Sequence, residues 1–211
     1  NKEEFEELIN VLASGIGSLT NPKKLADTFK SKKQVTISRN TLKNYLEYLE
    51  DAFLIESAVR YDLKGRKYID AMQKYYFTDV GLRNARLKFR QIEENHTMEN
   101  VIYNELRARG LQVDVGVYPV QERNKNGERI RKDYEIDFVC NLGTKRYYIQ
   151  SAYMMPNAEK IEQEQRSLLK IDDSFKKLIV VKDVLKPWYT DKGVFVIGLY
   201  DFLLDVNSLD L

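Results

Sequence analysis

The sequence predicts an α/β protein with a helix-rich first part and a second part that contains a mixed sheet. Before residue 53, apolar residues recur every three or four positions, which is the period of an amphipathic helix. After residue 112, short apolar and β-branched runs alternate with helical stretches, which predicts strands joined by helices. The change in pattern predicts two domains, residues 1–92 and residues 93–211.

Composition narrows the class of protein. The chain has 211 residues, 43% hydrophobic and 31% charged, as in globular proteins with a core. No apolar run approaches the roughly 20 residues that a membrane helix needs, so we expect no membrane partner.

The single cysteine, Cys140, cannot form an intramolecular disulfide and favours a cytoplasmic location. We interpret Cys140 as a strand hydrophobe and His96 as a residue that flanks a helix. The chain begins with Asn1 inside a helical pattern, which suggests an excerpt of a longer protein.

The first part predicts three helices followed by a two-stranded ribbon. The expected elements are helices at about residues 3–15, from Asn21 onward and at 39–51, strands at 53–61 and 67–77, and a short helix from Asp79. Ser38 is placed as the N-cap of the third helix, and Pro22 falls in the first turn of the second. This order of elements is that of a winged helix-turn-helix.

A winged helix that binds DNA inserts the N-terminal residues of its third helix into the major groove. The candidate DNA-binding residues on that helix are Arg39, Asn40, Lys43 and Asn44. Lys64 and Arg66, in the turn of the ribbon, would contact phosphate. Residues 19–45 carry seven basic residues against Asp27 alone, and such a patch attracts nucleic acid.

A protein partner stays open for the same domain. Winged helices also dock proteins, and the third helix carries the aromatic residues Tyr45 and Tyr48 beside Glu47 and Glu50. The charge pattern alone does not separate this alternative from double-stranded DNA.

The second part predicts a helix, three strands, a helix and two further strands. The expected elements are a helix at 93–109 ended by Gly110, strands at 113–119, from Tyr134 and at 146–150, a polar loop at 122–132, a helix at 158–170, strands at 178–181 and 195–198, and a terminal helix at 200–204.

The hairpin at 134–152 carries the clearest chemical signal. Ile136 and Phe138 are expected on one face of its first strand, with Asp137 on the opposite face. Gln150 lies in the second strand. A carboxylate in mid-strand beside a carboxamide on the next strand indicates a site for a hard divalent cation, which prefers oxygen ligands.

This layout, EIDFV, a turn and then YYIQSA, resembles the PD-(D/E)xK nucleases, in which carboxylates hold a cation that activates water and phosphate. The resemblance implies a restriction-endonuclease-like domain with Asp137 as the strand acid and Glu99, or less well Glu105, as the helix acid. Gln150 and Ala152 depart from the Glu and Lys of the pattern. We therefore expect a degenerate site of Glu99, Asp137 and Gln150 that does not cut, with Mg²⁺ at Asp137 and Glu99 as an open alternative.

Longer stretches carry a second resemblance. They are NTLKNYLEYLEDAFLI, KYYFTDVGLRNA, MENVIYNELRARG, EIDFV, KRYYIQSA and DSFKKLIVV. Together they resemble the C-terminal half of prokaryotic AAA+-type ATPases, labelled domain of unknown function 4143. In that family a P-loop domain precedes this segment, so the resemblance implies an N-terminal ATPase domain that binds ATP and Mg²⁺ outside the chain.

The chain itself has no Gly-rich phosphate loop, and we expect no cofactor in this segment apart from Mg²⁺ at the degenerate site. The resemblance implies a recognition region that binds DNA or a protein and reports the partner to the ATPase. The alternatives are an active divalent-metal-dependent DNA nuclease and a pure protein-interaction module.

Overall fold

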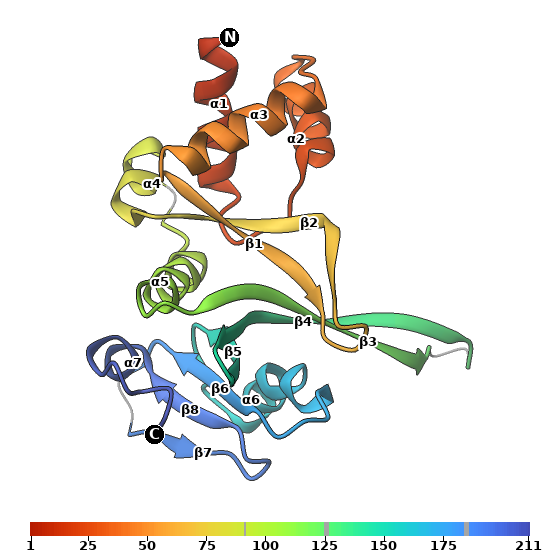
Figure 1. The fold of residues 1–211 in the computed structure, drawn as a ribbon, viewed down its shortest axis with the longest axis vertical. Helices are drawn as coiled ribbons and strands as arrows, with labels where there is room; N and C mark the ends of the chain where they lie inside the picture. The colour runs from red at the N-terminus through yellow and green to blue at the C-terminus, as the bar shows by residue number, and fades with distance from the viewer. Residues whose placement is uncertain (91, 125–126, 184–185) are drawn as a thin grey trace. The chain divides into compact units, whose positions relative to one another are not determined.

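A computed structural model of the chain describes residues 1–90, 92–124, 127–183 and 186–211 (Figure 1). The protein combines helices with a mixed sheet, which confirms the predicted α/β class. It forms two compact units: the first unit comprises 1–59 and 70–101, and the second unit comprises 60–69 and 102–211. The predicted boundary after residue 92 differs from this division, because the division passes through a helix and assigns the ribbon turn to the second unit.

The helices agree closely with the expected ones. They are α1 (Lys2–Ser14), α2 (Pro22–Thr28), α3 (Arg39–Asp51), α4 (Val80–Arg86), α5 (Glu94–Ala108), α6 (Ala158–Gln165) and α7 (Leu199–Leu204), with a π-helical turn η1 (Phe29–Lys33) and a 3-10 turn η2 (Leu168–Lys170). The predicted helix at 158–170 is too long, because the chain changes to the 3-10 turn that buries Leu168. In the described parts of the chain, no helix has the length and apolar character needed to cross a membrane.

The strands are β1 (Ile55–Asp62), β2 (Lys67–Phe77), β3 (Gln112–Arg123), β4 (Arg129–Leu142), β5 (Lys145–Ala152), β6 (Lys176–Val181), β7 (Trp188–Tyr189) and β8 (Phe195–Gly198). The second unit contains β3 to β8 and the facing ends of β1 and β2. The short strand β7 was not predicted, because two residues are too few to show a periodic pattern.

The first unit is built on capped helices. The side-chain oxygen of Ser38 accepts a hydrogen bond from the backbone N–H of Thr41 (3.0 Å), which starts α3 at the predicted residue. Asn21 caps α2 in the same way by accepting from the N–H of Lys24 (2.8 Å). The buried core of the unit comprises Leu8, Leu12, Ala13, Ile16, Leu25, Phe29, Ile37, Leu42, Leu46, Leu49, Ile55, Tyr75 and Phe77.

Two buried polar side chains connect the elements of the first unit. The guanidinium of Arg83 is fully buried, and its Nε donates to the carbonyl of Ala13 in the last turn of α1 (2.8 Å). The carboxamide of Asn100 on α5 bonds both backbone groups of Phe77 in β2: its Oδ1 accepts from N–H (2.8 Å), and its Nδ2 donates to the carbonyl (2.7 Å). Asn100 therefore forms hydrogen bonds with the backbone N–H and carbonyl of Phe77 in the way that a neighbouring strand would.

The second unit is a mixed sheet, as predicted. Its strand order, from the end of β1, is β1-β3-β4-β5-β6-β8-β7. The β1–β3, β5–β6 and β6–β8 pairs are parallel, whereas β3–β4, β4–β5 and β7–β8 are antiparallel.

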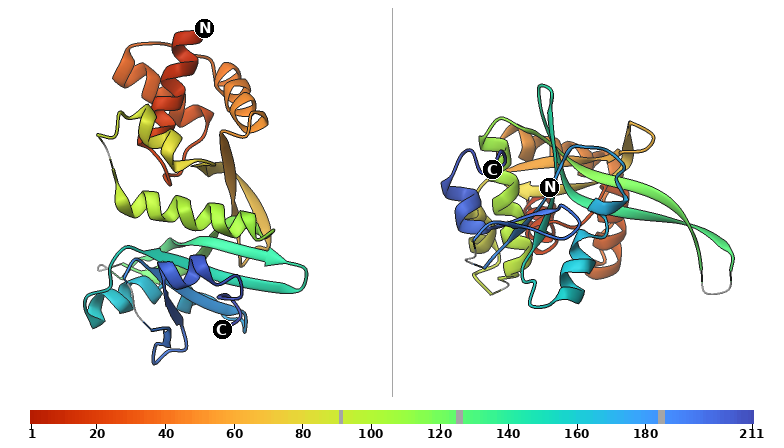
Figure 2. Two further views of the ribbon diagram at one scale, coloured as in Figure 1. Left: turned by 90° about the vertical axis from the view of Figure 1, so that its left-hand side faces the viewer. Right: turned by 90° about the horizontal axis from the view of Figure 1, so that it is seen from below.

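The predicted polar loop at 122–132 is wrong at both of its ends. β3 continues to Arg123 and β4 begins at Arg129, and the two strands run out together as a ribbon (Figure 2). Residues 125–126 of the predicted loop lie outside the described residues. The ribbon pairs through its backbone with both faces largely exposed, so its side chains are polar and show no alternation of apolar residues.

Close packing of the sheet depends on the missing side chain of Gly116 in β3. A Cβ at this position would lie 2.6 Å from Cγ2 of Val139 and 3.0 Å from Cβ of Ile136, both in β4. It would also lie 3.3 Å from Cδ1 of Leu63, just beyond β1.

We expect Gly116→Ala to destabilise the second unit by about 1–3 kcal/mol, since overpacking displaces neighbouring side chains or backbone. Urea unfolding followed by circular dichroism measures the change. Gly15→Ala is the comparison: Gly15 has a negative φ of −109°, and its added Cβ would meet only the Val11 carbonyl at 3.2 Å. Equal losses in the two variants would contradict this account of Gly116.

We expect Asn100→Ala to destabilise the first unit by about 1–3 kcal/mol, because the variant leaves buried backbone groups of Phe77 without their partner. Asn95→Ala on the exposed face of the same helix controls for helix propensity. Hydrogen exchange provides a local readout: the Phe77 amide should exchange faster in Asn100→Ala and at the wild-type rate in Asn95→Ala.

Candidate functional site

The structure places Asp137 and Gln150 on neighbouring strands of the second unit, as predicted. Oδ2 of Asp137 accepts a hydrogen bond from the backbone N–H of Ser151 (2.9 Å). Oε1 of Gln150 accepts from the N–H of Asp137 (3.4 Å) and from the hydroxyl of Ser167 (3.5 Å). The two side chains thus bond the strand backbones at the point where regular β4–β5 pairing ends, at Phe138.

Asp137 also lies at an irregularity of β4. Asp114 pairs with Val139 and Gly116 pairs with Ile136, so β4 has one residue more than β3 between these pairs. Such β-bulges are over-represented beside functional sites because they redirect a side chain.

The bulge changes which residues share a face. Ile136 and Val139 belong to one buried cluster, whereas Phe138 contacts the ring of Tyr103 on α5, with ring centroids 6.3 Å apart. The predicted placement of Ile136 and Phe138 on one face is therefore wrong, because the extra residue shifts the two-residue period.

The helix acid Glu99 belongs to the first unit and is 8% exposed. Its Oε1 accepts from Nζ of Lys74 (2.9 Å) and from the hydroxyl of Tyr76 (2.7 Å). A Cβ on Gly17 would lie 3.3 Å from both carboxylate oxygens, so that loop packs directly on the acid. The alternative helix acid, Glu105, lies in the second unit and pairs with Arg109 (2.8 Å).

The oxygens of these donors already accept hydrogen bonds within their own units. Across the described ranges, no three or more His, Cys, Asp and Glu side chains are grouped so that they could hold a metal ion. The Glu99 carboxylate is already neutralised by a buried lysine, and the Asp137 and Gln150 oxygens accept hydrogen bonds from protein groups. Mg²⁺ at Asp137 and Glu99 therefore stays a prediction.

The other predicted residues divide between the units. The four candidates on α3 are exposed side chains of the first unit, whereas Lys64 and Arg66 belong to the second unit. Cys140 is fully buried, and burial raises the pKa of its thiol, which agrees with its interpretation as a strand hydrophobe. His96 lies in the first turn of α5.

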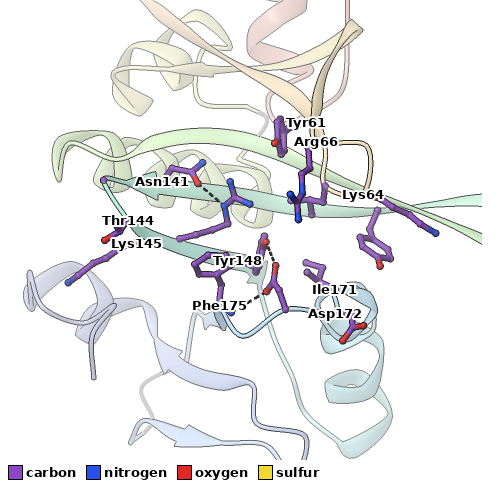
Figure 3. A pocket seen from close by; sticks show the side chains of 15 residues that line it. Tyr61, Lys64, Arg66, Asn141, Thr144, Lys145, Tyr148, Ile171, Asp172 and Phe175 are labelled. Carbon is purple, nitrogen blue, oxygen red and sulfur yellow. Dashed lines mark hydrogen bonds between the residues drawn. The ribbon is translucent and has the colours of Figure 1, made fainter.

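Lys64 and Arg66 line a cavity of about 590 Å³ in the second unit (Figure 3). The lining combines four cations with four aromatic rings and two acids, and these are Lys64, Arg66, Lys145, Arg146, Tyr61, Tyr118, Tyr148, Phe175, Asp172 and Asp173. Its volume falls within the range of small-molecule sites, about 300–1,000 Å³.

Arg146 lines this cavity and contacts two of its rings. Its guanidinium carbon lies 5.5 Å from the ring centroid of Phe175 and 6.0 Å from that of Tyr61, within reach of cation–π attraction. Its Nε donates to Oδ1 of Asn141 (2.7 Å), which fixes the plane of the guanidinium.

The wall beside Arg146 is also ordered by hydrogen bonds. The Tyr148 hydroxyl donates to Oδ2 of Asp173 (2.6 Å), and the backbone N–H of Phe175 donates to Oδ1 of the same carboxylate (3.1 Å). Burial, followed by this bond to Asp173, raises the pKa of Tyr148 to about 12, so the phenol stays protonated at physiological pH.

The second cationic edge is the ribbon turn. Oδ1 of the buried Asp62 accepts from the backbone N–H groups of Lys64 (3.0 Å) and Gly65 (2.8 Å), which closes an Asx turn. Lys64 and Arg66 are exposed, and neither forms an ion pair with any residue in the described ranges. Lys145 differs, because it pairs with Asp210 (2.7 Å).

Sequence reasoning missed most of this site. The run Arg146–Tyr147–Tyr148 predicts a strand but carries no motif of a site, although alternation alone places Arg146 and Tyr148 on one face. The partners of this run come from residues 61–66 and 171–175, which no local pattern connects to it.

Comparison with known proteins relates the chain to longer relatives. A family described as "Domain of unknown function (DUF8612)" matches residues 1–93. An uncharacterized protein of Haemophilus influenzae is 32% identical over 200 residues, covering 95% of this chain and 46% of the relative. Uncharacterized protein MJ1544 of Methanocaldococcus jannaschii is 29% identical over 188 residues, covering 87% of this chain and 39% of the relative.

Among solved structures, protein VC1899 from Vibrio cholerae aligns with 99% of this chain and 56% of its own length. The identity is 16% and the TM-score is 0.34, a value too low to support an inference about function. The chain spans less than half the length of both curated relatives it matches.

Proposed function

We propose that this chain is a recognition region of a longer protein and that its first unit binds double-stranded DNA through α3. The proposal is supported by one arrangement: α3 is anchored by Leu42, Leu46 and Leu49 in the core, and its N-terminal half presents polar residues to solvent. The exposed residues are Arg39, Asn40, Lys43 and Asn44. Arg and Asn side chains can form bidentate hydrogen bonds to guanine and adenine in the major groove.

The charge around α3 favours a polyanion. Lys23, Lys30 and Lys32 are exposed and form no ion pair with a residue of the described ranges. Lys33 pairs with Glu7 (2.8 Å) and Lys43 with Glu47 (3.6 Å), but all four side chains keep substantial solvent exposure. Exposed pairs of this kind are weak, so phosphate can compete for both lysines.

The relatives support the idea of a longer protein, because each is more than twice as long as the segment matched. The resemblance to AAA+-type ATPases suggests that the rest binds ATP and Mg²⁺. In this proposal, the chain binds its partner and passes the signal to that ATPase domain.

The first test is fluorescence anisotropy of a labelled duplex titrated with the chain at several salt concentrations. We expect the logarithm of the binding constant to fall linearly with log salt, by about 0.9 for each phosphate neutralised. Lys43→Ala should reduce the magnitude of that slope by about 0.9, the contribution of one phosphate contact. Arg39→Ala should weaken binding by about 1–3 kcal/mol, the cost of losing one base contact.

Lys2→Ala is the matched control, since it removes an exposed cation from α1 of the same unit. Its affinity and slope should equal those of the wild type. Absence of duplex binding at low salt, or equal effects of Lys2→Ala and Lys43→Ala, would contradict the assignment of α3.

A protein partner is the second candidate, favoured by exposed rings just beyond this surface. Phe53 is 78% exposed and Tyr48 is 58% exposed, with the acidic Glu47 and Asp51 nearby in sequence. Tyr45, the other aromatic residue of α3 that the sequence singles out, packs edge-on against Phe5 of α1, with ring centroids 5.2 Å apart. Weaker partner capture by Phe53→Ser, with duplex binding unchanged, would favour this candidate.

The nuclease alternative has a direct test. We expect no cleavage of plasmid DNA with either Mg²⁺ or Mn²⁺, because Gln150 and Ala152 stand where the nuclease pattern has Glu and Lys. Cleavage that disappears in Asp137→Ala but persists in Asp133→Ala would overturn this expectation. Asp133 is an exposed acid of the same strand and pairs with Arg131 (3.0 Å).

A further inference from the structure

The cavity of the second unit is bordered by aromatic rings, which a site for a simple anion does not need. Four aromatic rings and one guanidinium follow one another from β2 to the start of β6. We call this set the aromatic row, and it comprises Tyr68, Tyr61, Arg146, Phe175 and Tyr148. Ring centroids are 5.2 Å apart for Tyr68 and Tyr61 and 6.5 Å apart for Phe175 and Tyr148, and Arg146 lies between these two pairs.

The aromatic row is accessible at Tyr68 and Phe175 and is ordered by hydrogen bonds, whereas the ring of Tyr148 is buried at 1% exposure. Tyr68 and Phe175 are exposed, at 59% and 40%. The Tyr68 hydroxyl donates to Oδ2 of Asp114 (3.4 Å), and Tyr148 is held by Asp173. Side chains that are fixed in advance lose little entropy when a ligand stacks on them.

Positive charge borders the aromatic row. Lys64 and Arg66 project from a turn whose backbone is fixed by Asp62, and neither cation is neutralised by an ion pair within the described residues. The third cation, Arg146, can offer both charge and a flat face. A planar guanidinium stacks on unpaired bases as aromatic rings do.

The acids of the cavity argue against a purely polyanionic ligand. Asp173 is occupied by Tyr148 and Phe175, but Asp172 is exposed and adds negative charge at the rim. A ligand that only carries phosphates would be repelled there. A nucleotide carries an N–H donor on its base as well as a phosphate, and it can satisfy both kinds of group.

We propose that the second unit binds unpaired nucleotides of a single-stranded nucleic acid along the aromatic row. Successive bases stack on Phe175, Arg146 and Tyr61, and the backbone phosphates contact Lys64 and Arg66. Non-sequence-specific single-strand binding combines these two elements, a positive groove and rings for successive bases. This inference concerns a different unit and a different form of nucleic acid from the duplex-binding proposal, and it does not rest on it.

The experiment is an anisotropy titration of a fluorescent oligothymidine with the whole chain, repeated at several salt concentrations. We expect Phe175→Ala to weaken binding about tenfold or more, since stacking on one aromatic residue has about that effect. Lys64→Ala and Arg66→Ala should each lower the salt slope by about 0.7, the value for one phosphate of a single strand.

Matched controls separate the aromatic row from general effects of ring or charge loss. Tyr200→Ala removes an exposed ring from α7, and Lys192→Ala removes an exposed lysine, both in the second unit but outside the cavity. These variants should bind the oligonucleotide as the wild type does. Arg39→Ala, in the first unit, should also leave single-strand binding unchanged.

Competition then identifies the source of the nucleotide. If thymidine monophosphate displaces the oligonucleotide at similar concentration, the site takes free nucleotides; if only longer strands compete, it takes a strand. Both results support the proposed chemistry. No binding of either probe at low salt would overturn the proposal, as would binding that Arg39→Ala abolishes and Phe175→Ala leaves unchanged.

Discussion

The parallel pairing between the end of β1 and β3 is the contact on which the architecture of the second unit depends. Tyr61 pairs with Gly116 and Asp62 with Val117, and the N–H of Leu63 donates to the Val117 carbonyl (2.9 Å). Parallel strands cannot be joined by a tight turn, so this pairing brings distant parts of the chain together. The paired end of β1 forms one wall of the cavity through Tyr61. The Asx turn that follows adds the cations Lys64 and Arg66 to the cavity lining. Only a glycine at 116 allows such a close approach, because a side chain would occupy the space of its β4 neighbours.

Features encoded by neighbouring residues could be predicted from the sequence. The start of α3 follows from Ser38, because a serine side chain can accept a hydrogen bond from a free N–H group in the first turn of a helix. The end of α5 follows from Gly110, which adopts a φ of +80° that other residues avoid. The proximity of Asp137 and Gln150 could also be predicted, because a short turn fixes which residues of a hairpin oppose each other.

Features that depend on distant partners could not be predicted. The ribbon of β3 and β4 is held by backbone pairing and buries little side-chain surface, so its polar sequence resembles a loop. The bulge at Asp137 is invisible in a run where apolar residues occupy both faces of β4. Glu99 has the sequence context of an exposed helix acid, and only the fold shows that it is buried, paired with Lys74 and hydrogen-bonded by Tyr76. The cavity could not be predicted either, because its lining comes from four segments that are separate in the sequence.

The distribution of charge shows what the ribbon turn contributes to the second unit. Residues 102–211 carry 17 Lys and Arg and 17 Asp and Glu, so that part of the unit is neutral. Residues 60–69 add four basic residues against Asp62 alone, and Asp62 is buried and occupied by the turn backbone. The excess positive charge of the unit thus comes from the segment that lines the cavity. Because exposed charges act over about one Debye length, roughly 8–10 Å at physiological salt, the position of these cations determines their effect more than the net charge of the chain does. A nearly neutral protein can in this way present a local positive surface beside aromatic rings, which is the combination that single-strand binding uses.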